Sequence, residues 1–125
     1  MIRVGLTVIG FFLLAAPAFA QVTPAKTADT SKGKVFVDSK GMTLYVFNKD
    51  DTGVSTCYGK CATRWPPLEA AADAKPFGDW SIVTRKEGTK QWAYKGKPLY
   101  TWEQDKAPGD ITGDGYNNNW RLATP

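Results

Sequence analysis

The sequence predicts an all-β fold: a small antiparallel domain of two pseudo-symmetric repeats, with one short helix near 68–74. Three observations support this: residues recur at a constant offset of 55, short apolar segments alternate with glycine-containing turns, and aromatic residues are abundant. The recurring residues are Gly33, Lys40, Gly41, Leu44, Tyr45, Asp50 and Trp65, matched by Gly88, Lys95, Gly96, Leu99, Tyr100, Asp105 and Trp120. An offset kept over such a length indicates one supersecondary unit used twice, so that each copy covers the other.

The first twenty residues have the organisation of a signal peptide. Arg3 supplies a positive charge, residues 4–16 are almost all apolar, and Ala18-Phe19-Ala20 resembles a cleavage site. The apolar segment is shorter than the ~18 to 20 residues of a membrane-spanning helix. No cysteine follows the cleavage site to carry a lipid. We therefore expect cleavage near Ala20, a periplasmic or secreted location, and no membrane anchor.

The rest of the chain is divided into a leader and a single domain. Residues 21–32 are rich in Thr, Ala and Lys without apolar periodicity, so we predict a flexible leader. Residues 33–125 are predicted to form one β domain, with repeats at 33–68 and 88–122. Its aromatic residues supply enough apolar area for a single core, and we expect a monomer.

The first repeat is predicted to form a hairpin, to which an N-terminal strand can be added. Its strands cover 34–38 and 44–47, with a turn at 39–41. The helix at 68–74 has the sequence Leu-Glu-Ala-Ala-Ala-Asp-Ala and follows two prolines, which favour the first turn of a helix. Residues 75–79 end this helix and link the two halves.

The second half is predicted to form a three-stranded antiparallel meander over 80–85, 91–94 and 99–102. Gly41 and Gly96 occupy the same turn position in the two copies, where a positive φ would exclude other residues. Long loops rich in Asp and Gly follow the aromatic strands of both repeats.

Composition excludes several functional classes. The net charge is +4, but lysines and aspartates alternate along the chain, so we expect no nucleic-acid partner. The chain has no histidine, which removes the commonest general base and the commonest transition-metal ligand. No nucleophile, base and orienting group can be recognised together, and we therefore expect no enzymatic activity.

Cys57 and Cys61 are the only cysteines. In an exported protein such a pair is most simply a disulfide. The second copy has Thr112 and Tyr116 at the matching positions, so the repeat can be built without the bridge. A reversible thiol pair, or a Cu(I) site on the two thiolates, remains open.

The aspartates suggest two further hypotheses. Asp105, Asp110 and Asp114 lie in a Gly-rich loop that could wrap Ca²⁺, although the spacing is not that of an EF-hand. The alternative is that Asp and Asn side chains hold the loop through Asx-turns. Asp50 and Asp105 recur at the ends of equivalent strands, where aspartates commonly accept hydrogen bonds from the following turn. The alternative is a carboxylate pair that shares a proton.

The repeated strand end is the candidate binding site. Its residues are Tyr45, Phe47, Asp50, Tyr100, Trp102 and Asp105. Strand alternation places Tyr45 and Phe47 on one face and Leu44 and Val46 on the other, so the strand is either covered on both faces or shows one face to a ligand. Exposure of Tyr45 and Trp102 would favour a carbohydrate-binding module, whereas burial would make them core.

Two segments of the chain resemble a known family. They read Gly41-x-Thr43-Leu44-Tyr45-x-Phe47-x-x-Asp50 with Trp65-Pro66-Pro67-Leu68, and Gly96-Lys97-Pro98-Leu99-Tyr100-x-Trp102-x-x-Asp105. The chain is similar to bacterial exported repeats described as predicted lipoproteins with a Tyr-x-(Phe/Trp/Tyr)-x-x-Asp motif. The resemblance covers essentially the whole domain but implies no established activity, and the lipid anchor does not carry over because the lipobox cysteine is missing.

Together these observations predict a non-enzymatic, exported cell-envelope domain that binds an unknown envelope protein or a small ligand. A thiol redox or Cu(I)-handling protein centred on Cys57 and Cys61 is the first alternative. A carbohydrate-binding module is the second. No resident cofactor is expected beyond the Ca²⁺ and Cu(I) hypotheses above.

Overall fold

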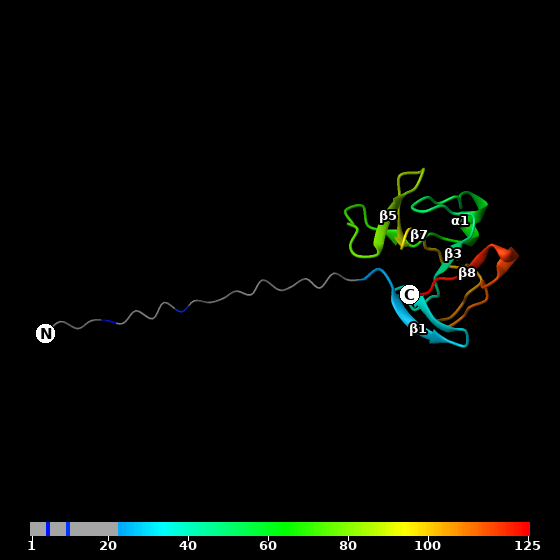
Figure 1. The fold of residues 1–125 in the computed structure, drawn as a ribbon, viewed down its shortest axis with the longest axis horizontal. Helices are drawn as coiled ribbons and strands as arrows, with labels where there is room; N and C mark the ends of the chain where they lie inside the picture. Colours follow the sequence, from blue (N-terminus) through cyan, green and yellow to red (C-terminus); the bar gives the residue numbers. More distant parts are fainter. Residues whose placement is uncertain (1–4, 6–9, 11–22) are drawn as a thin grey trace.

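Short β-hairpins and loops surround two central strands (Figure 1). The computed structural model describes Gly5, Gly10 and residues 23–125. Apart from the two glycines, the predicted signal peptide lies outside the described residues. The strands are β1 (Lys26–Thr30), β2 (Gly33–Val37), β3 (Tyr45–Phe47), β4 (Glu69–Ala70), β5 (Trp80–Thr84), β6 (Lys90–Tyr94), β7 (Lys97–Pro98) and β8 (Trp120–Leu122). The helices are α1 (Lys60–Arg64) and the 3₁₀-helix η1 (Tyr116–Asn118). Neither is long and apolar enough to cross a membrane.

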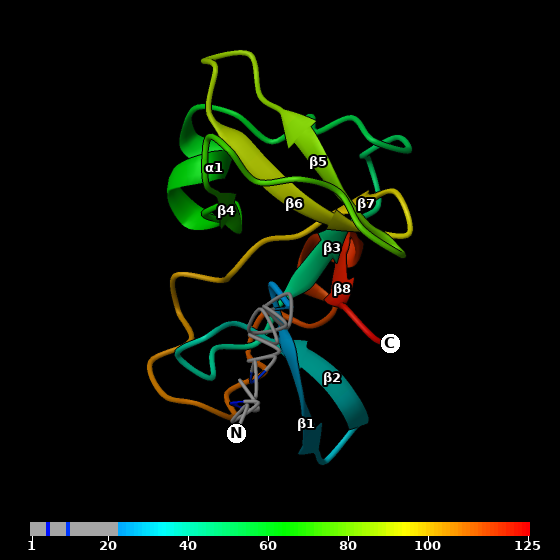
Figure 2. The same cartoon turned by 90° about the vertical axis from the view of Figure 1, so that its left-hand side faces the viewer.

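The strands form three small antiparallel sheets, which confirms the predicted all-β class. β1 pairs with β2, β3 pairs with β8, and β6 pairs with β5 on one side and with β4 and β7 on the other. Figure 2 shows the β1–β2 and β5–β6 hairpins at opposite ends, with β3 and β8 between them. The central strands therefore tie the two repeats together.

A pseudo-two-fold axis relates the repeats. Tyr45 and Tyr100 exchange backbone hydrogen bonds across it, with N···O distances of 2.8 and 3.0 Å. The amide of Ala123 donates to the carbonyl of Leu44 (2.9 Å). The equivalent bond, with both residues shifted by the repeat offset of 55, runs from the amide of Leu68 to the carbonyl of Leu99 (2.8 Å). Each repeat thus completes its sheet with a strand from the end of the other repeat.

Most of the predicted strands and both key turns are present. β2, β3, β5 and β6 coincide with predicted strands to within one or two residues. Gly41 and Gly96 have φ values of +83° and +81°, so both adopt the left-handed conformation that the turn position predicted. A Cβ atom on Gly96 would also lie 2.6 Å from the Thr52 side chain, in the loop of the opposite repeat.

The predicted helix at 68–74 is wrong. The Leu68 carbonyl accepts a hydrogen bond from the amide of Trp92 (2.9 Å), and the next two residues form β4. The backbone of this segment is therefore committed to β6, and that pairing outweighs the helix propensity of its alanines. Among residues 23–125 the one α-helix is α1, in the loop after Asp50.

The predicted flexible leader also needs correction. Residues 26–30 form β1, which pairs along its whole length with β2, from Lys26 opposite Val37 to Thr30 opposite Gly33. β1 is polar and mostly exposed, so no apolar alternation marked it as a strand. Its stability comes from backbone hydrogen bonds to the buried residues of β2.

The core has two parts, one on each face of the central strands. Leu44 and Val46 belong to the first cluster, with Phe36, Trp80 and Leu99. The second cluster is aromatic and contains the four residues Tyr45, Trp65, Tyr100 and Trp120, with Trp102 and Cys57 beside them. The strand is therefore covered on both faces, as one of the two sequence hypotheses required.

Candidate functional site

Four stacked aromatic rings form the centre of the second cluster. Phe47 stacks on Trp120 (ring centroids 4.3 Å apart), Trp120 on Trp65 (3.8 Å) and Trp65 on Trp102 (4.1 Å). Phe47 and Trp102 occupy equivalent positions in the two repeats, as do Trp65 and Trp120. The order is thus palindromic, and the pseudo-two-fold axis passes between the two central tryptophans. We call these four rings the aromatic stack.

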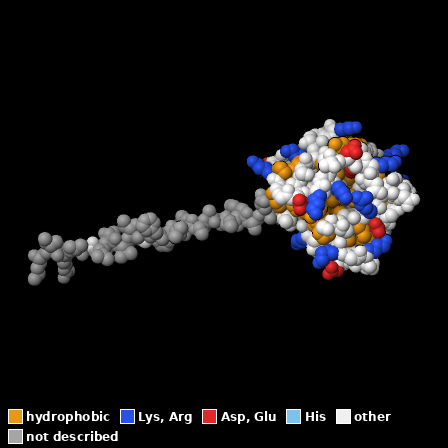
Figure 3. Space-filling model, in the orientation of Figure 1, with side chains coloured by type: hydrophobic (Ala, Val, Ile, Leu, Met, Phe, Trp, Pro, Cys, Tyr) orange, Lys and Arg blue, Asp and Glu red, His pale blue; other side chains and the backbone are white. Residues whose placement is uncertain are grey.

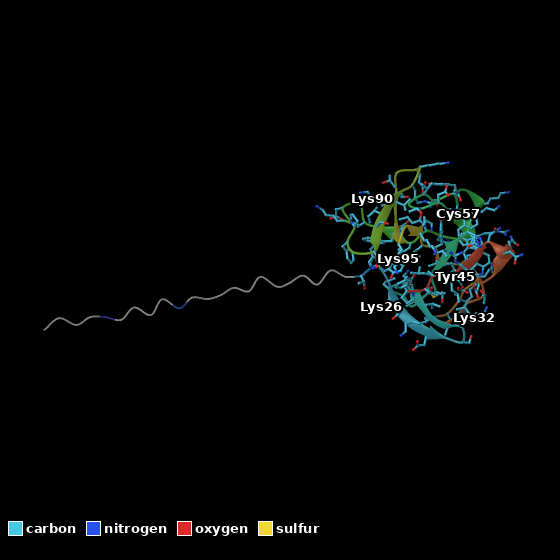
Figure 4. The ribbon with its side chains drawn as sticks, viewed as in Figure 1. Lys26, Lys32, Tyr45, Cys57, Lys90 and Lys95 are labelled. Atoms are coloured by element: carbon cyan, nitrogen blue, oxygen red, sulfur yellow. A yellow bond between two sulfur atoms is a disulfide. The ribbon has the colours of Figure 1, made fainter. Side chains whose placement is uncertain are left out.

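Two tyrosines pack against the side of the aromatic stack. Tyr45 meets Trp65 edge-on at 5.2 Å and Tyr100 meets Trp120 edge-on at 5.1 Å. Both tyrosines are completely buried, and Figure 4 shows Tyr45 inside the body of the domain. At Gly113 a Cβ atom would lie 2.6 Å from the Trp65 ring, so only glycine allows this approach. The stack is therefore tightly packed core.

The phenol groups of these tyrosines bind aspartates of the opposite repeat. Tyr45 Oη donates to Asp105 Oδ2 and Tyr100 Oη donates to Asp50 Oδ2, each at 2.6 Å. Tyrosine and aspartate of one motif are only five residues apart in sequence. Nevertheless each pairs with its counterpart in the other copy. We call these two contacts the crossed Tyr–Asp pairs.

Each aspartate also holds the loop that follows it. Asp50 Oδ1 accepts from the amide and hydroxyl of Thr56 (2.8 and 2.9 Å). Asp105 Oδ1 accepts from the amide and hydroxyl of Thr112 (3.0 and 2.6 Å). The prediction that these carboxylates accept hydrogen bonds from the following loop is confirmed. The two carboxylates bind different tyrosines and do not share a proton.

Burial determines the ionisation of the two tyrosines. Desolvation, and then the hydrogen bond to the aspartate, raise the pKa of Tyr45 and of Tyr100 well above the ordinary value of 10.0. A tyrosine with the ordinary pKa is already protonated at neutral pH, so the raised pKa values extend into alkaline solution the range over which both phenols donate to the aspartates.

A buried guanidinium of the second repeat extends the network around Ser55 of the first repeat. Arg85 is 2% exposed and donates to Ser55 Oγ (2.9 Å), Gln91 Oε1 (2.8 Å) and the Cys57 carbonyl (2.6 Å). It also donates to the carboxyl of Glu87, and this hydrogen bond lowers the pKa of that carboxyl below its ordinary value. Arg85 was not predicted from the sequence as a functional residue, because a single arginine at a strand end is ordinarily solvated.

The three carboxylates of the Asp-rich loop, for which a Ca²⁺ site was one hypothesis, all have partners within the protein. Both carboxylate oxygens of Asp105 accept the hydrogen bonds described above. Asp110 Oδ2 accepts from the amide of Ala107 (3.0 Å). Asp114 pairs with Lys32 at 2.7 Å. Within residues 23–125 no group of three acidic, Cys or His side chains is placed to hold a metal ion. The carboxylates of Asp105 and Asp110 accept from loop amides, which favours the alternative that aspartates hold the loop, but these amides lie seven and three residues away and not two as in an Asx-turn.

The two cysteines form a disulfide, Cys57–Cys61. Cys57 is completely buried beside the aromatic stack. Cys61 lies in α1 and is partly exposed. Figure 4 shows Cys57 close to α1. The bridge therefore joins the loop after Asp50 to the helix that covers the stack.

The six predicted binding residues come together, but mostly inside the protein. Tyr45 and Tyr100 have no exposed surface, and Trp102 is 6% exposed. Asp105 is also buried. Of the six, Phe47 and Asp50 alone retain surface that a ligand could touch.

A surface hollow lies between α1 and η1, next to the aromatic stack. Its volume is about 390 Å³, within the range of small-molecule sites. The apolar part of its lining consists of Phe47, Cys61, Trp65, Tyr116 and Trp120. Phe47, Cys61 and Tyr116 are partly exposed, whereas the two tryptophans form a nearly buried floor. We call it the α1–η1 hollow.

The polar part of the lining carries positive charge. It consists of Lys60, Arg64, Asn117 and Asn119 and contains no acidic residue. The hollow was not among the sites predicted from the sequence, although the 55-residue offset of the repeat indicates where it lies. Adding 55 to the α1 range of 60–64 gives 115–119, which contains η1 (Tyr116–Asn118), so the two helices are equivalents that face each other near the axis.

Comparison with known proteins gives one family. A family model described as a secreted repeat of unknown function matches residues 26–69 and 81–124. The first match begins at β1 and the second at β5, so the repeat extends further towards the N-terminus than the predicted boundaries of 33 and 88. No curated protein and no solved structure matches the chain.

Proposed function

The chain belongs to this family of secreted repeats, and from that premise we propose that it is a non-enzymatic cell-envelope domain that binds a small ligand in the α1–η1 hollow. We further propose that it acts as a monomer in the periplasm or outside the cell, after cleavage near Ala20. The observation that carries the proposal is the hollow itself, with partly exposed aromatic walls on a rigid, disulfide-linked core. Rigid scaffolds with preformed, mostly apolar pockets are typical of ligand sites.

Two observations support a binding role over a catalytic one. The chain has no histidine, and the buried Ser55 hydroxyl contacts Tyr100 and Arg85, neither of which is a base at neutral pH. A nucleic-acid role has little support, because basic side chains are scattered on the face in Figure 3 and not gathered in one patch.

Filling the hollow is expected to abolish binding without unfolding the protein. Asn119→Trp places a large ring in the hollow and leaves the net charge unchanged. We expect phenol, indole and benzoate to shift amide NMR signals of α1, η1 and Phe47 in the natural protein, and not in this variant. The matched control is Gln104→Trp, an exposed amide that does not line the hollow. Signals that shift only elsewhere in the natural protein would contradict the proposal.

The redox alternative rests on the unequal exposure of the two cysteines. Cys61 lines the hollow and Cys57 is buried, so an incoming thiolate would reach Cys61 first. Carbohydrate binding through Tyr45 and Trp102 is not favoured, because both are buried.

Reduction distinguishes a structural disulfide from a redox or Cu(I) site. If the bridge is structural, protein isolated from the periplasm has no free thiols. Reduction should then lower its free energy of unfolding by about 2 kcal/mol, the entropy of closing so short a loop. Thiol titration and urea denaturation in both states measure this. Two free thiols, or a bridge that cycles with almost no loss of stability, would favour the redox or Cu(I) alternative.

A further inference from the structure

We propose that the ligand of the α1–η1 hollow is a small, flat, unsaturated ring compound that carries a negative charge. This inference rests on the proposed function, because it assigns a chemical class to the same site. It follows from two properties of the lining, its unneutralised cations and the open end of the aromatic stack.

The charge of the lining is one-sided. Lys60 and Arg64 both line the hollow and both are exposed. Among residues 23–125 neither makes an ion pair, whereas Lys32 and Lys34 each pair with an aspartate. α1 has no acidic residue in its first turn. A carboxylate, sulfonate or phosphate on the ligand would provide the missing counter-charge, and a cationic ligand would be repelled.

The two ends of the aromatic stack differ, although the repeats are equivalent. At one end Trp102 is 6% exposed, and Tyr116 covers it at 4.8 Å between ring centroids. At the other end Phe47 is partly exposed and lines the hollow, and among residues 23–125 it stacks on Trp120 alone. A flat ring placed against Phe47 would continue the stack, and offset stacking is the geometry that aromatic pairs prefer.

The hollow also offers hydrogen bonds at its margin. Within the described part of the chain, the side-chain amides of Asn117 and Asn119 have no hydrogen-bond partner, and both residues line the hollow. Amide donors there can bind further oxygens of the ligand. The combination of an aromatic wall, two cations and free amides fits an aromatic anion better than an aliphatic or a cationic compound.

Three probes of one shape and different charge test this proposal: naphthalenesulfonate, naphthalenemethanol and naphthylmethylammonium. Binding to the oxidised protein is measured by isothermal titration calorimetry, and the site is located by amide NMR shifts. We expect the sulfonate to bind about tenfold more tightly than the alcohol, with the ammonium weakest, and the preference to fall with added salt.

The charge contribution is isolated with two double variants. Lys60→Gln with Arg64→Gln should lower the preference for the sulfonate over the alcohol about tenfold, and this ratio of affinities isolates the charge from any change in the shape of the hollow. Lys40→Gln with Lys75→Gln removes the same charge from exposed positions outside the hollow and should change neither.

Two results would overturn the inference, and they differ. If the alcohol or the ammonium binds at α1 and η1 as tightly as the sulfonate, the anionic class is wrong while the hollow remains a binding site. If no probe shifts signals at α1, η1 or Phe47, the proposed function fails together with the ligand class.

Discussion

Replacement of Trp65 by alanine is expected to lower the free energy of unfolding by about 4 kcal/mol, as for other large aromatic core residues. Trp65 is 2% exposed, stacks between Trp120 and Trp102, and receives the edge of Tyr45. Its removal therefore leaves a cavity between the two repeats, in the middle of the stack. Urea denaturation followed by far-ultraviolet circular dichroism measures the loss.

The pseudo-symmetry provides an internal check on this result. Trp120 occupies the equivalent position and is 4% exposed, so Trp120→Ala should cost a similar free energy. Val54→Ala serves as the surface control, because Val54 is 50% exposed and should change stability by less than about 0.5 kcal/mol. A loss below about 1 kcal/mol in both tryptophan variants would show that the aromatic stack does not hold the repeats together.

Alkaline solution is expected to destabilise the protein through the crossed Tyr–Asp pairs. The folded-state pKa values of Tyr45 and Tyr100 lie well above 10.0, whereas in the unfolded chain both titrate near 10. Above pH 10 the unfolded chain therefore releases two protons that the folded protein keeps. The contribution that the two protonated tyrosines make to the free energy of unfolding is complete below pH 10 and is lost as the pH rises. The two together should remove roughly 2.5 kcal/mol between pH 10.5 and 11.5.

Phenylalanine variants test whether these tyrosines cause the alkaline loss. Tyr45→Phe and Tyr100→Phe each remove one titrating group, so either variant should have about half the slope of unfolding free energy against pH. Each variant also loses stability at neutral pH, because an aspartate oxygen loses its donor. The slope of unfolding free energy against pH is therefore the quantity that reports the titration of each tyrosine. An unchanged slope in both variants would assign the alkaline loss to other groups.

The exchange of partners between repeats explains why both predictions involve large effects. Tyr45 has its edge contact with Trp65 in its own repeat, but its hydrogen bond to Asp105 in the other. Tyr100 repeats this pattern with Trp120 and Asp50. A change in one repeat therefore also removes contacts of the other, and we expect the domain to unfold as one cooperative unit.

The sequence by itself determined the class of fold, the repeat and the turns. The constant offset of 55 predicted two equivalent units, and Gly41 and Gly96 marked turns whose backbone conformation only glycine adopts readily. The cysteine pair and the loop-capping role of Asp50 were also predicted, because both depend on residues close in sequence.

Only the structure decided which segments without a strand pattern pair as strands, and which features arise from contacts between the repeats. β1 is polar and becomes a strand by pairing with β2, while the alanine-rich segment after Leu68 joins β6 and does not form a helix. The crossing of the Tyr–Asp pairs, the burial of Tyr45 and Trp102, and the hollow between α1 and η1 all arise where one copy meets the other. Local propensity and spacing describe each copy separately, whereas the packing of the two copies decides which side chains are buried and which remain available to a ligand.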